Sequence, residues 1–143
     1  MMTNEPEMTA IERIEHEGTL YAYIFRKKLA VGDGVKFLTP ADYPLQLGLI
    51  ERKKGYSFRP HLHRDMHYEV NTTQEFLYVE KGRMKVKIYT SDWKVIYATI
   101  LDAGDFFFSI TGGHSFDVLE EVRLIEVKQG PYPGDQYAKR FKE

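Results

Sequence analysis

The sequence of 143 residues contains no cysteine. Without thiols the chain has no disulfide bridges, no cysteine nucleophile and no cysteine zinc site. Any metal site must therefore be built from nitrogen and oxygen ligands. The absence of disulfides is also in keeping with a reducing compartment.

The chain also lacks an excess of charge of one sign and long apolar runs. It has 20 Lys and Arg against 21 Asp and Glu, a formal net charge of −1. With these charges spread along the chain, no overall field draws it to nucleic acid or to an anionic membrane. No apolar run approaches the ~20 residues that cross a bilayer, and the first ten residues carry no signal-peptide pattern. We expect a cytoplasmic protein with neither nucleic acid nor membrane as a partner.

Several catalytic signatures are missing as well. The sequence has no GxSxG, no GxxxxGK[ST], no GxGxxG and no HExxH. These absences argue against a nucleophile-elbow hydrolase, a P-loop enzyme, a dinucleotide-binding fold and a zinc peptidase of the HExxH type.

Aromatic and alternating segments, in contrast, are abundant. The chain has ten Tyr and nine Phe, and 43% of its residues are hydrophobic, which favours strands around a sizeable core. Residues 83–89 give the clearest pattern, with Met84, Val86 and Ile88 on one face and basic residues on the other. The triplets Arg26-Lys27-Lys28 and 52–54 are interpreted as charged strand ends.

About nine such short strands, separated by turn residues at intervals of roughly ten, predict a sandwich, a jelly roll or a small barrel. The fold class is therefore all-β. We expect one domain at residues 11–130, a disordered arm at residues 1–10 and a tail at residues 131–143 that packs outside the barrel.

Four side chains form a candidate metal site. His61 and His63 are two apart on an extended segment, so their side chains leave the same face. Glu75 opens the next apolar strand, and His114 opens another after the turn at 112–113. Three imidazoles and one carboxylate suit a divalent transition metal: Fe, Mn, Ni, Co, Cu or Zn.

These residues lie in two motifs that resemble those of the cupin superfamily. Gly55, His61, His63, Glu75 and Gly82 match the spacing of the first motif, apart from eleven residues between His63 and Glu75. The run from Gly104 through Ile110 and Gly112 to His114 is similar to the second motif. The resemblance implies a double-stranded β-helix, a jelly-roll cupin barrel, in which the three histidines and the glutamate bind one metal.

The eleven residues between His63 and Glu75, a longer loop than is usual in the family, contain rival ligands. His67 and Glu69, again two apart, are alternative metal ligands or substrate contacts. Tyr78 is a third candidate for substrate contact, because some sugar-epimerising cupins use a His and Tyr pair. The catalytic residues themselves stay unassigned.

Two function classes follow. The first is a metal-binding cupin that binds or transforms a small polar molecule in the barrel; as an enzyme it would be a metal-dependent dioxygenase or isomerase. The alternative is a metal-independent epimerase- or isomerase-like cupin acting on a carbohydrate or nucleotide sugar, or a non-enzymatic ligand-binding module. We also expect a homodimer, formed through the segments Leu20–Phe25 and Trp93–Leu101.

Overall fold

The computed structural model describes residues 10–143 of the chain. The predicted N-terminal arm, apart from Ala10, lies outside the described residues. The chain divides into two compact units, one containing the residues up to Leu29 together with Thr73–Glu143, the other Ala30–Thr72. Each unit is described by itself.

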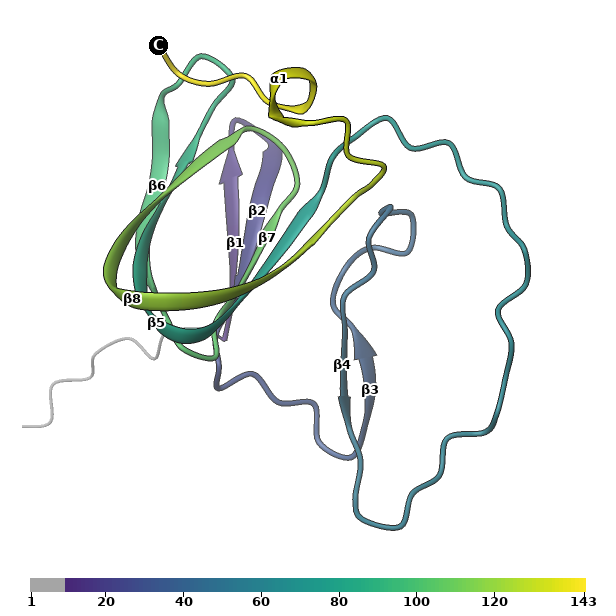
Figure 1. The fold of residues 1–143 in the computed structure, drawn as a ribbon. Coiled ribbons are helices and arrows are strands. Elements are labelled where there is room, and N and C mark those ends of the chain that lie inside the picture. Colours follow the sequence, from purple (N-terminus) through teal and green to yellow (C-terminus); the bar gives the residue numbers. More distant parts are fainter. Residues whose placement is uncertain (1–9) are drawn as a thin grey trace, which may run out of the picture. The chain divides into compact units, whose positions relative to one another are not determined.

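The larger unit is an antiparallel β-structure that curls into a half-barrel (Figure 1). Its sheet has the order β1-β2-β7-β5-β6, and β8 pairs with β5. No helix among residues 10–143 is long and apolar enough to cross a membrane. The predicted all-β class is confirmed. The elements are β1 (Ile11–His16), β2 (Thr19–Phe25), β5 (Glu75–Tyr89), β6 (Val95–Asp102), β7 (Phe106–Ser109), β8 (Gly113–Lys128) and α1 (Asp135–Ala138).

Strand β5 is the hub of this sheet. One of its edges pairs with β8 along its whole length. The other edge pairs with β7 through Glu75–Tyr78 and with β6 through Arg83–Tyr89. The sheet therefore branches at the middle of β5, and its two halves turn toward each other.

Gly82 lies at this branch point. A glycine between two apolar runs predicts a turn, but the strand continues through Gly82, with φ of +88° and shifts of register between Val79 and Met84. A Cβ at Gly82 would lie 2.0 Å from the carbonyl oxygen of Glu121. Glycine at this position thus bends β5 while β8 crosses it closely. The sequence pattern predicts two strands, at 114–119 and 122–128, but in the structure they are one long strand, β8.

The core follows the two-residue period of β5. Leu77 and Val79 are buried in its first half, and Met84, Val86 and Ile88 in its second half, as the alternation predicts. The largest fully buried side chains elsewhere are those of Ile24, Phe25, Leu101, Phe107 and Phe108.

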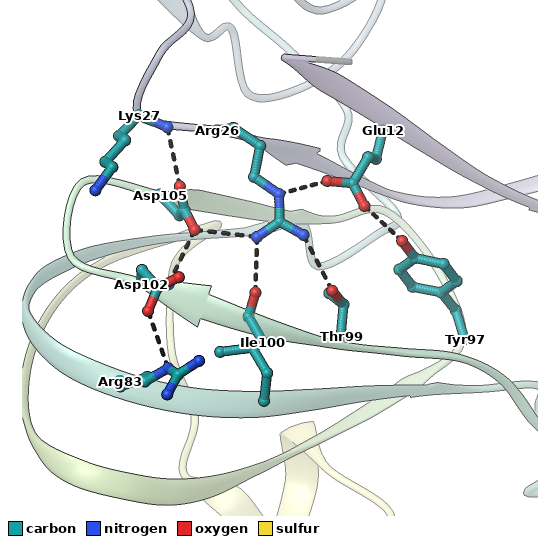
Figure 2. A network of polar contacts seen from close by, with 9 residues as sticks. All are labelled: Glu12, Arg26, Lys27, Arg83, Tyr97, Thr99, Ile100, Asp102 and Asp105. Carbon is teal, nitrogen blue, oxygen red and sulfur yellow. Dashed lines mark hydrogen bonds and ion pairs between the residues drawn. The ribbon is translucent and has the colours of Figure 1, made fainter. Parts of the chain in front are cut away.

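A buried arginine connects the two halves of the curled sheet (Figure 2). Arg26, only 6% exposed, follows β2 and donates hydrogen bonds to Glu12 on β1, to Asp105 and to two groups of β6. Those two groups are Thr99 Oγ1, at 3.0 Å, and the carbonyl oxygen of Ile100, at 2.7 Å. Arg26 was predicted to be a charged strand end; it is instead the ion that joins β1 and β2 to β6.

The two carboxylates around Arg26 accept further hydrogen bonds. Asp105 accepts hydrogen bonds from the backbone N–H groups of Lys27 and Asp102, each at 2.9 Å. Glu12 also accepts the hydroxyl of Tyr97. Burial of the guanidinium opposes its charge, but Glu12 and Asp105 outweigh that effect and raise the pKa of Arg26.

The sheet order also bears on the predicted dimer surface. β2 lies between β1 and β7, and Ala22–Phe25 are paired on both edges. The homodimer through Leu20–Phe25 and Trp93–Leu101 stays a prediction. Trp93 precedes β6 and lies in the turn before it, with a φ of +69°.

The smaller unit has only a two-stranded antiparallel sheet of β3 (Gly34–Phe37) and β4 (Gly48–Glu51). The leucine alternation at 45–50 predicts a strand, which is shortened to β4. The glycine and proline signals at 32–44 predict a loop with a short edge strand, and β3 lies there. Residues 52–74 form no strand. None of the buried hydrophobic residues that make up the core lies in this unit.

Replacing Arg26 tests the buried network. Arg26→Met should lower the free energy of unfolding by about 3–5 kcal/mol, because it leaves Glu12 and Asp105 buried without their cation. Arg83→Met, which breaks the half-exposed pair of Arg83 with Asp102, should cost less than about 1 kcal/mol. Urea unfolding of both variants measures the difference. Equal costs would show that Arg26 is an ordinary surface cation.

Two glycines with similar backbone angles form a matched pair of tests. Gly18→Ala, at φ of +79° in open space, should cost about 1 kcal/mol through backbone strain alone. Gly82→Ala adds the collision with the backbone of β8 and should cost about 3 kcal/mol or more. Thermal unfolding compares them, and a Gly82→Ala protein as stable as Gly18→Ala would contradict the close crossing of β5 and β8.

Candidate functional site

A chain of three polar side chains lies at one end of the larger unit. The Nε2 atom of His114 is 3.2 Å from Glu75 Oε1, and the Nδ1 atom of His114 is 3.3 Å from Ser109 Oγ. Because the ionised carboxylate can only accept, Nε2–H is the donor to Glu75, and in the neutral ring Nδ1 is then the acceptor for the serine hydroxyl. The three residues come from the start of β5, the end of β7 and the start of β8.

The curl of β5 and β8 brings Glu75 and His114 together. In the ladder His114 is paired with Ile88, thirteen residues beyond Glu75 on β5. A straight strand would separate Glu75 from Ile88 by about 40 Å. The 3.2 Å contact is possible only because the ribbon bends back on itself, and Ser109 completes the chain because it is the partner of Glu75 on β7.

The Glu75 carboxylate is held in its ionised form. Burial of the group opposes ionisation, but the hydrogen bond and charge of His114, with the nearby Lys128, lower the pKa of Glu75 to about 2. Lys128 Nζ lies 3.6 Å from Glu75 Oε2 and 3.3 Å from Glu126 Oε1. Glu75 therefore fixes the orientation of the His114 ring.

These side chains line a pocket of about 710 Å³. Three hydroxyl-bearing residues, Thr73, Thr111 and Ser115, add further polar groups to its wall. The volume is in the range of small-molecule sites, and an apolar lining with a few convergent polar groups is typical of them.

One wall of the pocket is aromatic. Trp93 lies edge-on to Tyr89, with ring centroids 5.9 Å apart, and a Cβ added at Gly113 would be 3.3 Å from the indole. Trp93 has a positive φ, which is uncommon for a bulky residue, and backbone strain of this kind is concentrated at functional sites. The backbone thus holds the indole against Gly113 as a flat surface for a ring.

The C-terminal segment supplies cations to the same wall. The guanidinium of Arg140 lies 5.1 Å from the centroid of the Trp93 ring and donates a hydrogen bond to the carbonyl oxygen of Ser91. Lys142 lies over the ring of Tyr89, at 5.9 Å. The predicted tail is therefore part of the pocket wall, and it favours a ligand with negative charge.

The structure places the predicted ligands in different units. Glu75 and His114 lie together in the larger unit. His61 and His63 belong to the smaller one, exposed, with ring centroids 5.2 Å apart. Within residues 10–143, no three His, Asp or Glu side chains form a group able to hold a metal ion. The four-ligand site stays a prediction.

The residues of the larger unit do not by themselves make a metal site. Of the His, Asp and Glu residues of this unit, Glu75 and His114 are the two that line the pocket. Both ring nitrogens of His114 are already hydrogen-bonded, and the ammonium of Lys128 competes for the carboxylate.

The additional candidates lie outside the pocket lining. His67 and Glu69 are exposed residues of the smaller unit. Tyr78 points to the other face of β5, where its ring lies 5.0 Å from that of Phe106.

Sequence reasoning missed Ser109, Lys128, Trp93 and Arg140. One signal for Ser109 was available, because it is the only polar residue of the run Phe106–Ser109. Lys128 likewise ends a strand of alternating character. Nothing in the sequence pattern points to the turn angle of Trp93.

No protein-family model, curated protein or solved structure matches this chain.

Proposed function

We propose that this protein binds a small anionic, ring-containing polar molecule, such as a sugar phosphate or a nucleotide sugar, in the pocket around His114. The observation that carries the proposal is the hydrogen-bonded chain Ser109–His114–Glu75, which lines a pocket that also has an aromatic and cationic wall. We also propose that the half-barrel belongs to a jelly roll of the cupin type, as the motif resemblance implies.

The hydrogen-bonded side chains of Ser109, His114 and Glu75 suit proton transfer of the kind that isomerases and epimerases carry out. Nδ1 of His114, directly or through the Ser109 hydroxyl, accepts a proton from the ligand and returns it. The ionised Glu75 stabilises the imidazolium in between. The ring of the ligand stacks on Trp93, and its negative charge lies near Arg140 and Lys142.

Binding and proton transfer are tested separately. Sugar 1-phosphates and nucleotide sugars should raise the melting temperature, and Trp93→Ala should weaken binding by about fivefold, since ring stacking contributes about 1 kcal/mol. The matched control is Tyr137→Ala, because Tyr137 is exposed and outside the pocket. Calorimetry gives the affinities.

In D₂O, a bound ligand with a carbonyl group, such as a keto sugar phosphate, should exchange the hydrogen on the carbon next to that carbonyl, whose oxygen takes up the electron pair. His114→Gln should slow this exchange by about 10²-fold or more while leaving affinity nearly unchanged. Proton NMR follows the exchange. Binding without any exchange would reduce the proposal to a ligand-binding module, and no binding of any probe would overturn it.

Metal binding is a second candidate, favoured by the adjacent rings of His61 and His63. If the first proposal holds, protein stripped with a chelator should bind ligand as tightly as untreated protein. Elemental analysis of tag-free protein gives the metal content. One metal per chain, lost in a His61→Ala, His63→Ala double variant together with ligand binding, would favour the metal-dependent function instead.

A further inference from the structure

Residues 56–70 alternate like a half-buried strand but form none. The large apolar side chains occupy even positions and are exposed, Leu62 at 95%. Every odd position is polar. A strand with this period has one apolar and one polar face. The apolar set is Tyr56, Phe58, Leu62, Met66, Tyr68 and Val70, and the polar set is Ser57, Arg59, His61, His63, Asp65, His67 and Glu69.

The unit that contains this segment has no core to cover the apolar face. Nine of the seventeen large hydrophobic residues exposed in the described chain lie between Ala30 and Thr72. An isolated two-stranded sheet such as β3–β4 is marginal in water. An exposed apolar area of this kind marks an interaction surface.

The segment is complementary to itself in the antiparallel direction. With Leu62 opposite Leu62 of a second copy, Arg59 faces Asp65, Phe58 faces Met66 and Tyr56 faces Tyr68. Each of these pairs occurs twice, as a twofold axis requires. Opposite charges and apolar pairs directly across two strands are stabilising.

The position of Pro60 is compatible with this register, and a shifted register fits less well. If the Leu62 pair is of the non-hydrogen-bonded kind, Pro60 is also in a non-hydrogen-bonded position, so its missing N–H faces away from the partner strand. A shift of the register by two residues would place Leu62 opposite Arg64 and Arg59 opposite His67. That register loses the Arg59–Asp65 pair and the Leu62–Leu62 pair, and it keeps apolar pairs only between Phe58 and Tyr68 and between Tyr56 and Val70.

We propose that residues 56–70 pair antiparallel with the same residues of a second copy of this chain, with Leu62 at the twofold axis, and form a homodimer. The surface differs from the segments Leu20–Phe25 and Trp93–Leu101, and it does not depend on the ligand proposed above.

Cross-linking tests the register. Because the chain has no cysteine, Leu62→Cys introduces a single thiol, and the two copies lie close enough at the axis for a disulfide. The matched control is Met66→Cys on the same face, whose two copies would be about 27 Å apart along the ribbon. Leu62→Cys should cross-link on mild oxidation, and Met66→Cys should not. Equal cross-linking of both variants would overturn the register.

A charge swap tests the pairing in solution. Arg59→Asp or Asp65→Arg alone puts like charges opposite each other twice per dimer, and each should weaken the dimer by about tenfold in sedimentation experiments. The double variant Arg59→Asp, Asp65→Arg should restore it. A wild-type monomer at micromolar concentration, or a double variant no tighter than the single ones, would overturn the proposal. A monomer whose segment resists protease would mean that the strand is covered within a single chain.

Discussion

The buried guanidinium of Arg26 is the contact on which the curled form of the larger unit depends. β1 and β6 are not paired with each other, so no ladder of backbone hydrogen bonds joins the two ends of the sheet. Arg26 bonds to Glu12 on one side and to Thr99 and the Ile100 carbonyl on the other. A cation with this many fixed donors replaces a missing strand pairing, and the planar fork of arginine suits several acceptors at once.

The curl of the sheet in turn brings the residues of the site together. Glu75 and His114 stand at places in the β5–β8 ladder that a flat sheet would hold far apart. They meet because β5 bends at Gly82, where only a residue without a side chain lets β8 cross. The site is thus a consequence of curvature, and a change at Gly82 or Arg26 acts on His114 without touching it.

The sequence could predict what depends on local pattern. The two-residue period correctly predicted the buried positions of β5, and the cupin-like spacing drew attention to Glu75 and His114, which the fold does bring together. It could not predict the role of Arg26, because a basic triplet at a strand end looks the same whether it meets water or carboxylates. Nor could it show that the strand continues through Gly82, since a glycine between two apolar runs usually marks a turn.

The segment 56–70 shows the other limit of local pattern. Its alternation specifies which side chains share a face, but a strand exists only when a neighbour satisfies its backbone groups. The His61 and His63 pair that suggested a metal site belongs to the polar face of this segment. Because the apolar face must be covered by something, whatever covers it fixes the direction in which these imidazoles point. The chemistry of the histidines therefore depends on the partner of Leu62 on the opposite face.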